Sequence, residues 1–266
     1  MEWDEPGIVL SLRPYGEADA VANVLTPEHG AHRGLARGAL SRRSAATWQP
    51  GNAVQLRWVG RLSDQLGTYS AELVHAAAAL AMESRLALAL LTAACAVADG
   101  ALPEREPHPR VFEGLLRLVA GLPSGALGPA DLIRWEALLL ADLGYGLDLS
   151  RCVVSGATEG LAWVSPRTGR AVSDAAAGIW KEKLLRLPPL LLAGEAASAD
   201  PAPADATLAD ATLADPTLAD WRDGLLLTGH FLARHAFGIH HRPLPQPRLA
   251  LYDLIDKLAT GENDAR

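Results

Sequence analysis

The chain has 266 residues, of which 49% are hydrophobic and 21% charged, so it can bury the core of one large domain or two modest ones. Its formal net charge of −7 argues against indiscriminate binding to nucleic acid, although it leaves a local binding surface open. The only two cysteines, Cys95 and Cys152, exclude a disulfide framework and a four-thiolate metal site and fit a reducing cytoplasm.

The N-terminus reads MEWDEP and has no apolar segment of the kind found in secretory signals. The most apolar stretch, from Ala87 to Ala98, has 12 residues, whereas a membrane-spanning helix needs roughly 20. We therefore expect a cytoplasmic protein without a membrane partner.

Residues 1–75 carry short alternating apolar runs separated by turn signals. The expected strands are GIVLSLR (7–13), ADAVANVLT (18–26), AHRGLARG (31–38), AVQLRWV (53–59) and GTYSAELV (67–74). Five short strands bounded by Gly, Pro or Asp predict a small barrel. We expect an OB-fold nucleic-acid-binding domain, with an SH3-like barrel as the alternative.

One part of this region lacks carboxylates although the chain as a whole is acidic. Between His29 and Ser63 there is no Asp or Glu, and the basic side chains in that stretch are all arginines: Arg33, Arg37, Arg42, Arg43, Arg57 and Arg61. Guanidinium groups suit bidentate contacts with phosphate. The open face of an OB barrel commonly binds single strands. We predict that these arginines bind nucleic acid, or else form a solvated face paired with acids elsewhere in the fold.

Two tryptophans accompany the arginines. Trp58 alternates with Val54 and Leu56 on the expected fourth strand, so we place it in the core and expect Arg57 to point away from it. Trp48 lies in the loop that precedes this strand, and we expect its ring to stack on bases.

From residue 76 the apolar spacing changes to that of helices, which predicts an α+β chain whose second domain, residues 76–266, is α-helical. The expected helices cover 75–100, 109–122, 129–146, 174–187, 221–238 and 247–261. Residues 148–173 are rich in glycine and irregular.

An acidic low-complexity segment, residues 194–220, interrupts the helical domain. It contains the repeat DATLA, DATLA, DPTLA, which begins at Asp205. One leucine in five residues cannot offset the entropy lost when the backbone is ordered. We expect a mobile or weakly helical surface insertion that arose by neutral drift of the repeat.

The order of the motifs resembles that of the RecO family of bacterial recombination mediators. The likeness to that family's N-terminal barrel rests on the opening GIVL strand, Tyr15-Gly16-Glu17-Ala18-Asp19, His29-Gly30, Arg37-Gly38-Ala39, Pro50-Gly51, and Trp58 with Arg61. RWEALLLADLGYGLDLSRC, LAWVSPRTGRAVS and KLLRLPPLLL resemble the family's helical domain. The match covers most of the chain and leaves out the insertion.

This resemblance implies a non-catalytic DNA repair protein of the RecF pathway. Such proteins bind single- and double-stranded DNA and anneal complementary strands. With RecR they help RecA displace the single-strand-binding protein SSB, and they contact the acidic C-terminal tail of SSB. A nucleoid-associated location in the cytoplasm follows from the same resemblance, and we expect no cofactor.

Many members of this family carry a zinc finger, with two CxxC-type pairs, where residues 148–173 lie here. In this chain Cys152 stands alone, and Ser155 occupies the place of a second thiol. Structural zinc needs thiolate or imidazole ligands at tetrahedral spacing. We therefore expect a degenerate zinc-finger-like segment that binds no metal and is held by packing.

A second basic group lies in the same segment. Arg151, Arg167 and Arg170 are either solvated turn residues or an extension of the DNA surface of the barrel.

The sequence has no P-loop, nucleophile elbow or dinucleotide-binding motif in the right context, so we do not expect an enzyme. The main alternative to DNA binding is a protein-interaction adaptor. In that case the basic barrel face binds an acidic protein, and contact with DNA is incidental.

Overall fold

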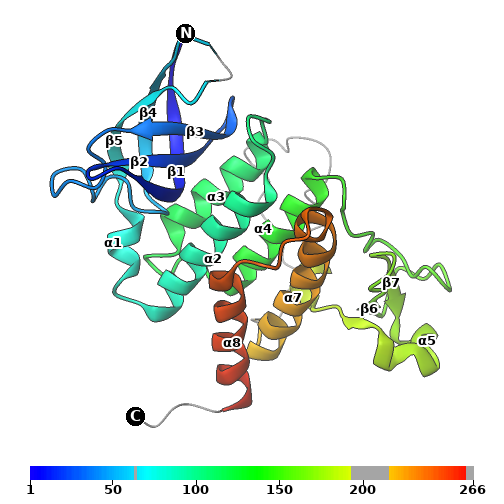
Figure 1. Ribbon diagram of the computed structural model, residues 1–266. Coiled ribbons are helices and arrows are strands. Elements are labelled where there is room, and N and C mark those ends of the chain that lie inside the picture. The colour runs from blue at the N-terminus through cyan, green and yellow to red at the C-terminus, as the bar shows by residue number, and fades with distance from the viewer. Residues whose placement is uncertain (63–64, 193–215, 262–266) are drawn as a thin grey trace, which may run out of the picture.

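The computed structural model describes residues 1–62, 65–192 and 216–261. A barrel of N-terminal strands sits on one side of a helical body, and a small lobe lies on the other side (Figure 1). Among the described residues, no helix is both long enough and apolar enough to cross a membrane.

The barrel has five strands, β1 (Glu2–Tyr15), β2 (Asp19–Thr26), β3 (Gly30–Ala36), β4 (Ala53–Val59) and β5 (Thr68–His75). Their order is β1-β2-β3-β5-β4, and the barrel closes because β1 pairs antiparallel with both β2 and β4. Strand β3 pairs in parallel with β5. This arrangement confirms the predicted OB fold.

Period-two alternation fills the barrel interior. On β4, Val54, Leu56 and Trp58 are buried, whereas Arg57 between them is exposed, as predicted. Gly34 on β3 is needed for close packing, because a Cβ there would lie 2.6 Å from ring carbons of Tyr69.

The helical body is built from α1 (Ala77–Ala81), α2 (Arg85–Ala101), α3 (Pro109–Gly121), α4 (Pro129–Asp142), α6 (Pro189–Leu192), α7 (Leu218–Phe231) and α8 (Gln246–Thr260). The prediction of a single helix over 75–100 is wrong, because the helix is interrupted between α1 and α2. Ser84 has extended backbone angles there, and its hydroxyl accepts a hydrogen bond from the Ala87 amide at 3.2 Å. A serine that caps a new helix competes with continuation of the old one.

The barrel and the helical body share one core. Ile8 and Leu25 of the barrel belong to the same buried cluster as Leu91 of α2. Gly51, at the end of the β3–β4 loop, packs so closely on Leu91 that a Cβ would lie 2.7 Å from its side chain. The barrel and the helical body are therefore packed against each other, although the chain changes from strands to helices after β5.

Residues 148–187, which we call the lobe, form a sheet that the sequence did not predict. It contains β6 (Leu161–Val164), β7 (Ala171–Ser173) and β8 (Leu185–Arg186) in the order β7-β6-β8. The helix predicted over 174–187 is wrong beyond its first turn. Helix α5 (Asp174–Ala177) ends at Gly178, whose φ is +47°, and a 3-10 helix (Gly178–Lys183) follows.

Most of the predicted insertion, residues 194–215, lies outside the described residues. Its C-terminal end belongs to α7. The Thr217 hydroxyl accepts from the Asp220 amide at 3.2 Å, and the Asp220 carboxylate accepts from the Thr217 amide at 2.9 Å. This capping box starts α7 at Leu218. A π-helical turn (Leu232–Phe237) and a short 3-10 helix (Gly238–His240) follow α7.

Candidate nucleic-acid interface

Among the residues that the structure describes, two of the six predicted arginines form ion pairs. Arg33 on β3 donates to the Glu104 carboxylate at 2.8 Å, and Glu104 lies in the connection between α2 and α3. Arg57 on β4 donates to Glu2 on β1 at 2.7 Å. For these two side chains the structure matches the alternative of a solvated, ion-paired face.

Three other arginines follow β3 in one loop and are exposed: Arg37, Arg42 and Arg43. Within the described ranges, none of the three forms an ion pair with a carboxylate. The loop is fixed to the β1–β2 turn, because the Leu40 amide donates to the Ala18 carbonyl at 2.9 Å.

A second tie uses the carboxylate of Asp19, the first residue of β2. The Gly38 amide donates to Asp19 Oδ1 at 2.7 Å, so this carboxylate accepts a hydrogen bond from the backbone of the loop. Gly38 has a φ of +64°, which explains why a glycine interrupts the arginines at this point.

The same end of the barrel carries two residues that sequence reasoning missed. Arg13 pairs with Val21 across β1 and β2, and Val21 pairs with Leu35 across β2 and β3. Arg13 is exposed. It lies on the same face of the sheet as Leu35 and as every second residue of β3 counted from Leu35. Tyr15, at the end of β1, is 61% exposed.

We call this group the barrel-end cluster: Arg13, Tyr15, Arg37, Arg42 and Arg43. The end of the β1–β2 hairpin and the β3–β4 loop, which carry it, project from the left of the barrel in Figure 1. Glu17 is an exposed acid in the same turn. Tyr15 could have been identified from the sequence, because it is an aromatic residue directly before the turn at Gly16.

Arg61 lies at the other end of β1. The neighbouring residue, Gly60, accepts a hydrogen bond from the N-terminal amine of Met1 at 2.7 Å. The barrel-end cluster begins at Arg13, close to the C-terminal end of the same 14-residue strand. The predicted arginines therefore do not form one continuous group.

The expectation that Trp48 stacks on bases is wrong, because its side chain is only 4% exposed. The loop folds back over the barrel, and Trp48 stacks on Tyr69 with ring centroids 6.2 Å apart. Asn52 holds this conformation by donating to the Ala46 carbonyl at 2.7 Å. Trp58 is 1% exposed, which confirms its predicted place in the core.

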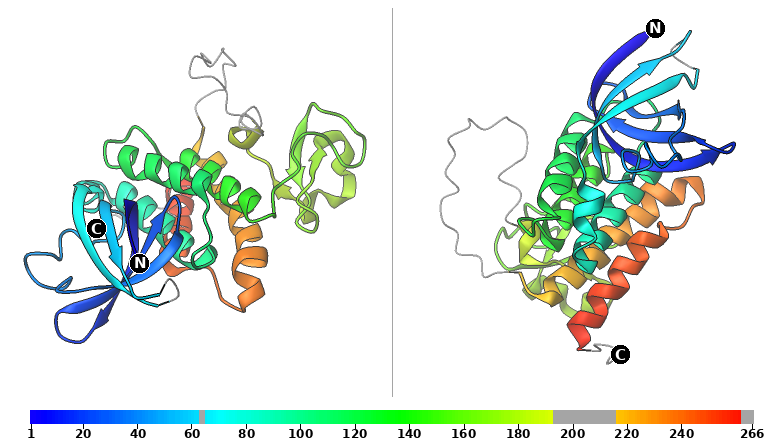
Figure 2. Two further views of the ribbon diagram at one scale, coloured as in Figure 1. Left: turned by 90° about the horizontal axis from the view of Figure 1, so that it is seen from above. Right: turned by 90° about the vertical axis from the view of Figure 1, so that its left-hand side faces the viewer.

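The second basic group lies in the lobe. Arg151 and Arg167 are exposed, and Arg170 pairs with Asp148 at 3.2 Å. The lobe and the barrel lie on opposite sides of the helical body, as Figure 1 and the view from above in Figure 2 show. This group therefore does not extend the barrel surface.

The zinc-finger-like segment centres on the Cys152 side chain. Its Sγ is buried and accepts hydrogen bonds from the Ser155 amide and the Ser173 hydroxyl, both at 3.4 Å. Desolvation raises the pKa of this thiol, but the bonds from Ser155 and Ser173 outweigh it and lower the pKa to about 6. A single cysteine bonded to a backbone amide and a hydroxyl does not provide a zinc ligand set, and the described residues contain no cluster of three or more His, Cys, Asp or Glu able to hold a metal.

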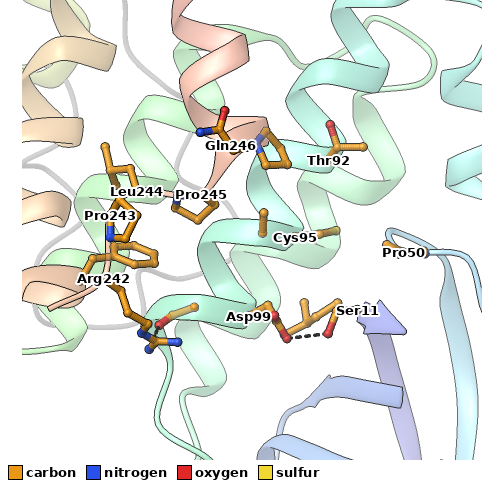
Figure 3. A pocket seen from close by; sticks show the side chains of 15 residues that line it. Ser11, Pro50, Thr92, Cys95, Asp99, Arg242, Pro243, Leu244, Pro245 and Gln246 are labelled. Atoms are coloured by element: carbon orange, nitrogen blue, oxygen red, sulfur yellow. Dashed lines mark hydrogen bonds between the residues drawn. The ribbon is translucent and has the colours of Figure 1, made fainter. Parts of the chain in front are cut away.

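A cavity of about 530 Å³ lies between the barrel, α2 and the start of α8 (Figure 3). Several of its polar groups are engaged with neighbours: Ser11 donates to Asp99 at 2.7 Å, and Arg242 donates to the Gly100 carbonyl at 2.9 Å. Burial and the nearby Asp99 raise the pKa of Cys95, on the cavity wall, to about 12, so this thiol stays protonated. The cavity therefore offers packing surface and no activated nucleophile.

Comparison with known proteins gives two family matches. Residues 1–77 match the family described as recombination protein O N terminal, and residues 82–244 match recombination protein O C terminal. Curated relatives named DNA repair protein RecO include that of Gluconacetobacter diazotrophicus, 56% identical over 98% of both chains. The proteins of Acidiphilium cryptum (54%, all of both chains) and Rhodospirillum centenum (43%, 98% of this chain and 97% of that one) carry the same name.

Proposed function

The chain belongs to the RecO family, which gives it a role in DNA repair and recombination, and from this premise we propose that it binds single- and double-stranded DNA and anneals complementary strands. We place the DNA contact at the barrel-end cluster.

The observation that carries this proposal is a loop with three exposed arginines that is held by hydrogen bonds against the β1–β2 turn. Exposed guanidinium groups without carboxylate partners attract phosphates and release bound counterions. The exposed ring of Tyr15 supplies a face on which a base can stack. Such a surface screens the charge of two strands without reading their bases, so complementary strands can pair.

The partners follow from the family rather than from the geometry. With RecR, the protein would help RecA displace SSB, and it would bind the acidic C-terminal tail of SSB. The support for these partners is the full-length match to RecO proteins. A binding role fits better than a catalytic one, because the exposed groups of the cluster are those that hold a polyanion.

The test is fluorescence anisotropy of a labelled single strand at several salt concentrations. If the four arginines of the cluster each neutralise one phosphate, the logarithm of the binding constant falls with the logarithm of salt at a slope of about −2.8. Arg37→Glu, Arg42→Glu and Arg43→Glu together should reduce the magnitude of this slope by about 2.

A matched control reverses three exposed cations of the helical body: Arg85, Arg117 and Lys257. It changes the net charge equally and should leave the slope intact. A slope that does not differ between wild type and the cluster variant contradicts the proposal. If annealing survives in that variant while capture of RecR or SSB is lost, the barrel is a protein-binding adaptor.

A further inference from the structure

The lobe exposes large apolar side chains in its 3-10 helix. Ile179 is 89% exposed and Trp180 is 58% exposed. Adjacent exposed apolar side chains of this size usually mark a contact surface. Neither residue belongs to the barrel-end cluster, which lies on the opposite side of the helical body (Figures 1 and 2).

Cations lie over the aromatic rings of this part of the lobe. The Lys183 ammonium is 5.2 Å from the ring centroid of Trp180. The Trp163 ring has two such neighbours, with the Lys181 ammonium 5.4 Å and the Arg186 guanidinium 4.8 Å from its centroid. The Trp163 indole also donates to Asp174 at 2.9 Å, which fixes the orientation of the ring.

The lobe is positively charged in an acidic protein. It has six cationic and four acidic side chains. Two of the acids are neutralised, because Asp148 pairs with Arg170 and Asp174 pairs with Lys181. In the described part of the chain, the lobe cations that form no ion pair are Arg151, Arg167, Lys183 and Arg186, beside the exposed acids Glu159 and Glu182.

We propose that the lobe is a second nucleic-acid site, at which a base of a single strand stacks on Trp180 while Lys183 and Arg186 hold the adjoining phosphates. We call these three residues the Trp180 surface. Aromatic rings beside cations are the recurring elements of single-strand binding, and every base has a face that can stack. A double helix keeps its bases stacked inside and cannot use the ring.

The shape of the surface favours a single strand of nucleic acid over an acidic peptide. Ile179 and Trp180 stand out from the lobe, whereas an apolar peptide anchor needs a concave pocket. The 530 Å³ cavity lies between the barrel and α2, away from the lobe. A stacking ring needs no pocket, so the protruding indole suits a base.

This inference rests on the proposed function only in taking DNA as the polyanion, and the experiment separates the two sites. Anisotropy is measured with a fluorescein-labelled thymine oligonucleotide and the full-length protein in which Arg37, Arg42 and Arg43 are changed to Glu. In that background Trp180→Ala should weaken binding at least about fivefold, the lower end of the loss expected when one stacking ring is removed. Trp180→Phe should retain most of the affinity, and Ile179→Ala, which removes exposed apolar surface beside the ring, should change nothing.

Ultraviolet crosslinking of wild-type protein to a 5-iodouracil oligonucleotide gives a second readout that needs no substitution. Mass spectrometry should find the crosslink on the peptide that contains Trp180. No residual oligonucleotide binding in the triple-arginine background overturns the Trp180 surface. Equal losses from Trp180→Ala and Ile179→Ala, or a wild-type crosslink confined to the barrel, also overturn it. Unchanged binding in that background would instead contradict the barrel-end cluster.

Discussion

Arg33 on β3 and Glu104 in the α2–α3 connection are joined by a 2.8 Å hydrogen bond although 71 residues separate them in sequence. The pair ties the barrel to the helical body. It also removes from the DNA surface one of the arginines that the sequence pointed to. Side chains on both sides are 40% exposed, so the pair stabilises the fold only modestly.

Glu104→Gln should release Arg33 for phosphate. We expect the magnitude of the salt slope for single-stranded DNA to rise by about 0.7, the value for one additional phosphate contact. The measurement is anisotropy over a salt series. Glu106→Gln is the control, because Glu106 is exposed in the same connection and its carboxylate lies 3.9 Å from the His108 ring rather than beside Arg33. Equal effects of the two substitutions would show that only net charge matters.

Annealing should be faster with both DNA surfaces than with the barrel-end cluster alone. If the barrel-end cluster and the Trp180 surface each hold one strand, one molecule brings two strands to a high effective concentration. Trp180→Ala should then slow the annealing of complementary labelled strands about tenfold or more while the barrel still binds a single strand. Ile179→Ala is the control. An annealing rate that merely follows the affinity for one strand would speak against the two-surface mechanism.

Cys152 should titrate near neutral pH. Desolvation raises the pKa of its thiol, but the hydrogen bonds donated by Ser155 and Ser173 lower that pKa to about 6. Burial near Asp99 raises the pKa of Cys95 to about 12. The ultraviolet absorbance of thiolate in the native protein should therefore show one transition near pH 6. Cys152→Ala should remove this transition, and Ser173→Ala should move it to higher pH. A native protein with no transition below pH 8 would exclude this assignment.

His32 should make the fold sensitive to acid. Burial lowers its pKa from 6.5 to about 4, helped by the charges of Arg105 and His29. The unfolded chain takes up a proton near pH 6.5, while the folded chain stays neutral down to about pH 4. The stability that depends on neutral His32 is therefore complete above pH 6.5 and falls as the pH drops from 6.5 to 4, by on the order of 2 kcal/mol.

The test for His32 replaces it with asparagine. The Tyr69 hydroxyl donates to the His32 carbonyl at 3.0 Å, so His32 Nδ1, 2.8 Å from that hydroxyl, is the donor to it. An asparagine amide can make the same bond without titrating. Urea unfolding at pH 7 and pH 4.5 should show a smaller loss of stability on acidification for His32→Asn than for wild type. Identical losses would place the acid sensitivity elsewhere.

Breaking the buried ion pair of the helical body should destabilise the fold strongly. Glu136 on α4 and Arg248 on α8 are 0% and 1% exposed, and the Arg248 Nε donates to Glu136 at 2.5 Å. Thr228 also donates to Glu136, at 2.5 Å. Arg248→Met alone leaves a buried carboxylate without its cation and should lower the free energy of unfolding by about 3 to 5 kcal/mol.

The double variant Glu136→Leu with Arg248→Met should recover most of that loss, because an apolar pair of similar volume needs no charge compensation. Thr228 keeps a partner in the Gly224 carbonyl at 3.1 Å, so its hydroxyl is not left without a hydrogen bond. Denaturant unfolding of the two single variants and the double variant completes the cycle. A double variant as unstable as the sum of the singles would show that the pair has no coupling energy.

Features that depend on neighbours along the chain could be predicted without a structure. Strand β4 spans the predicted residues 53–59, because alternation of apolar and polar side chains is a local property of an extended strand. The same alternation placed Trp58 inside the barrel and Arg57 outside. The order of motifs, which needs no coordinates, was sufficient to suggest the family that the comparisons then showed.

Which side chains are available to a ligand depends on contacts that the sequence does not reveal. Trp48 sits in a loop whose folding back onto Tyr69 has no local signature, and Arg33 meets a carboxylate contributed by the helical body. The exposure of Trp180 likewise depends on how the lobe turns after Gly178. Periodicity reports which face a residue takes on its own element, whereas accessibility and charge pairing are set by contacts between segments that are distant in sequence.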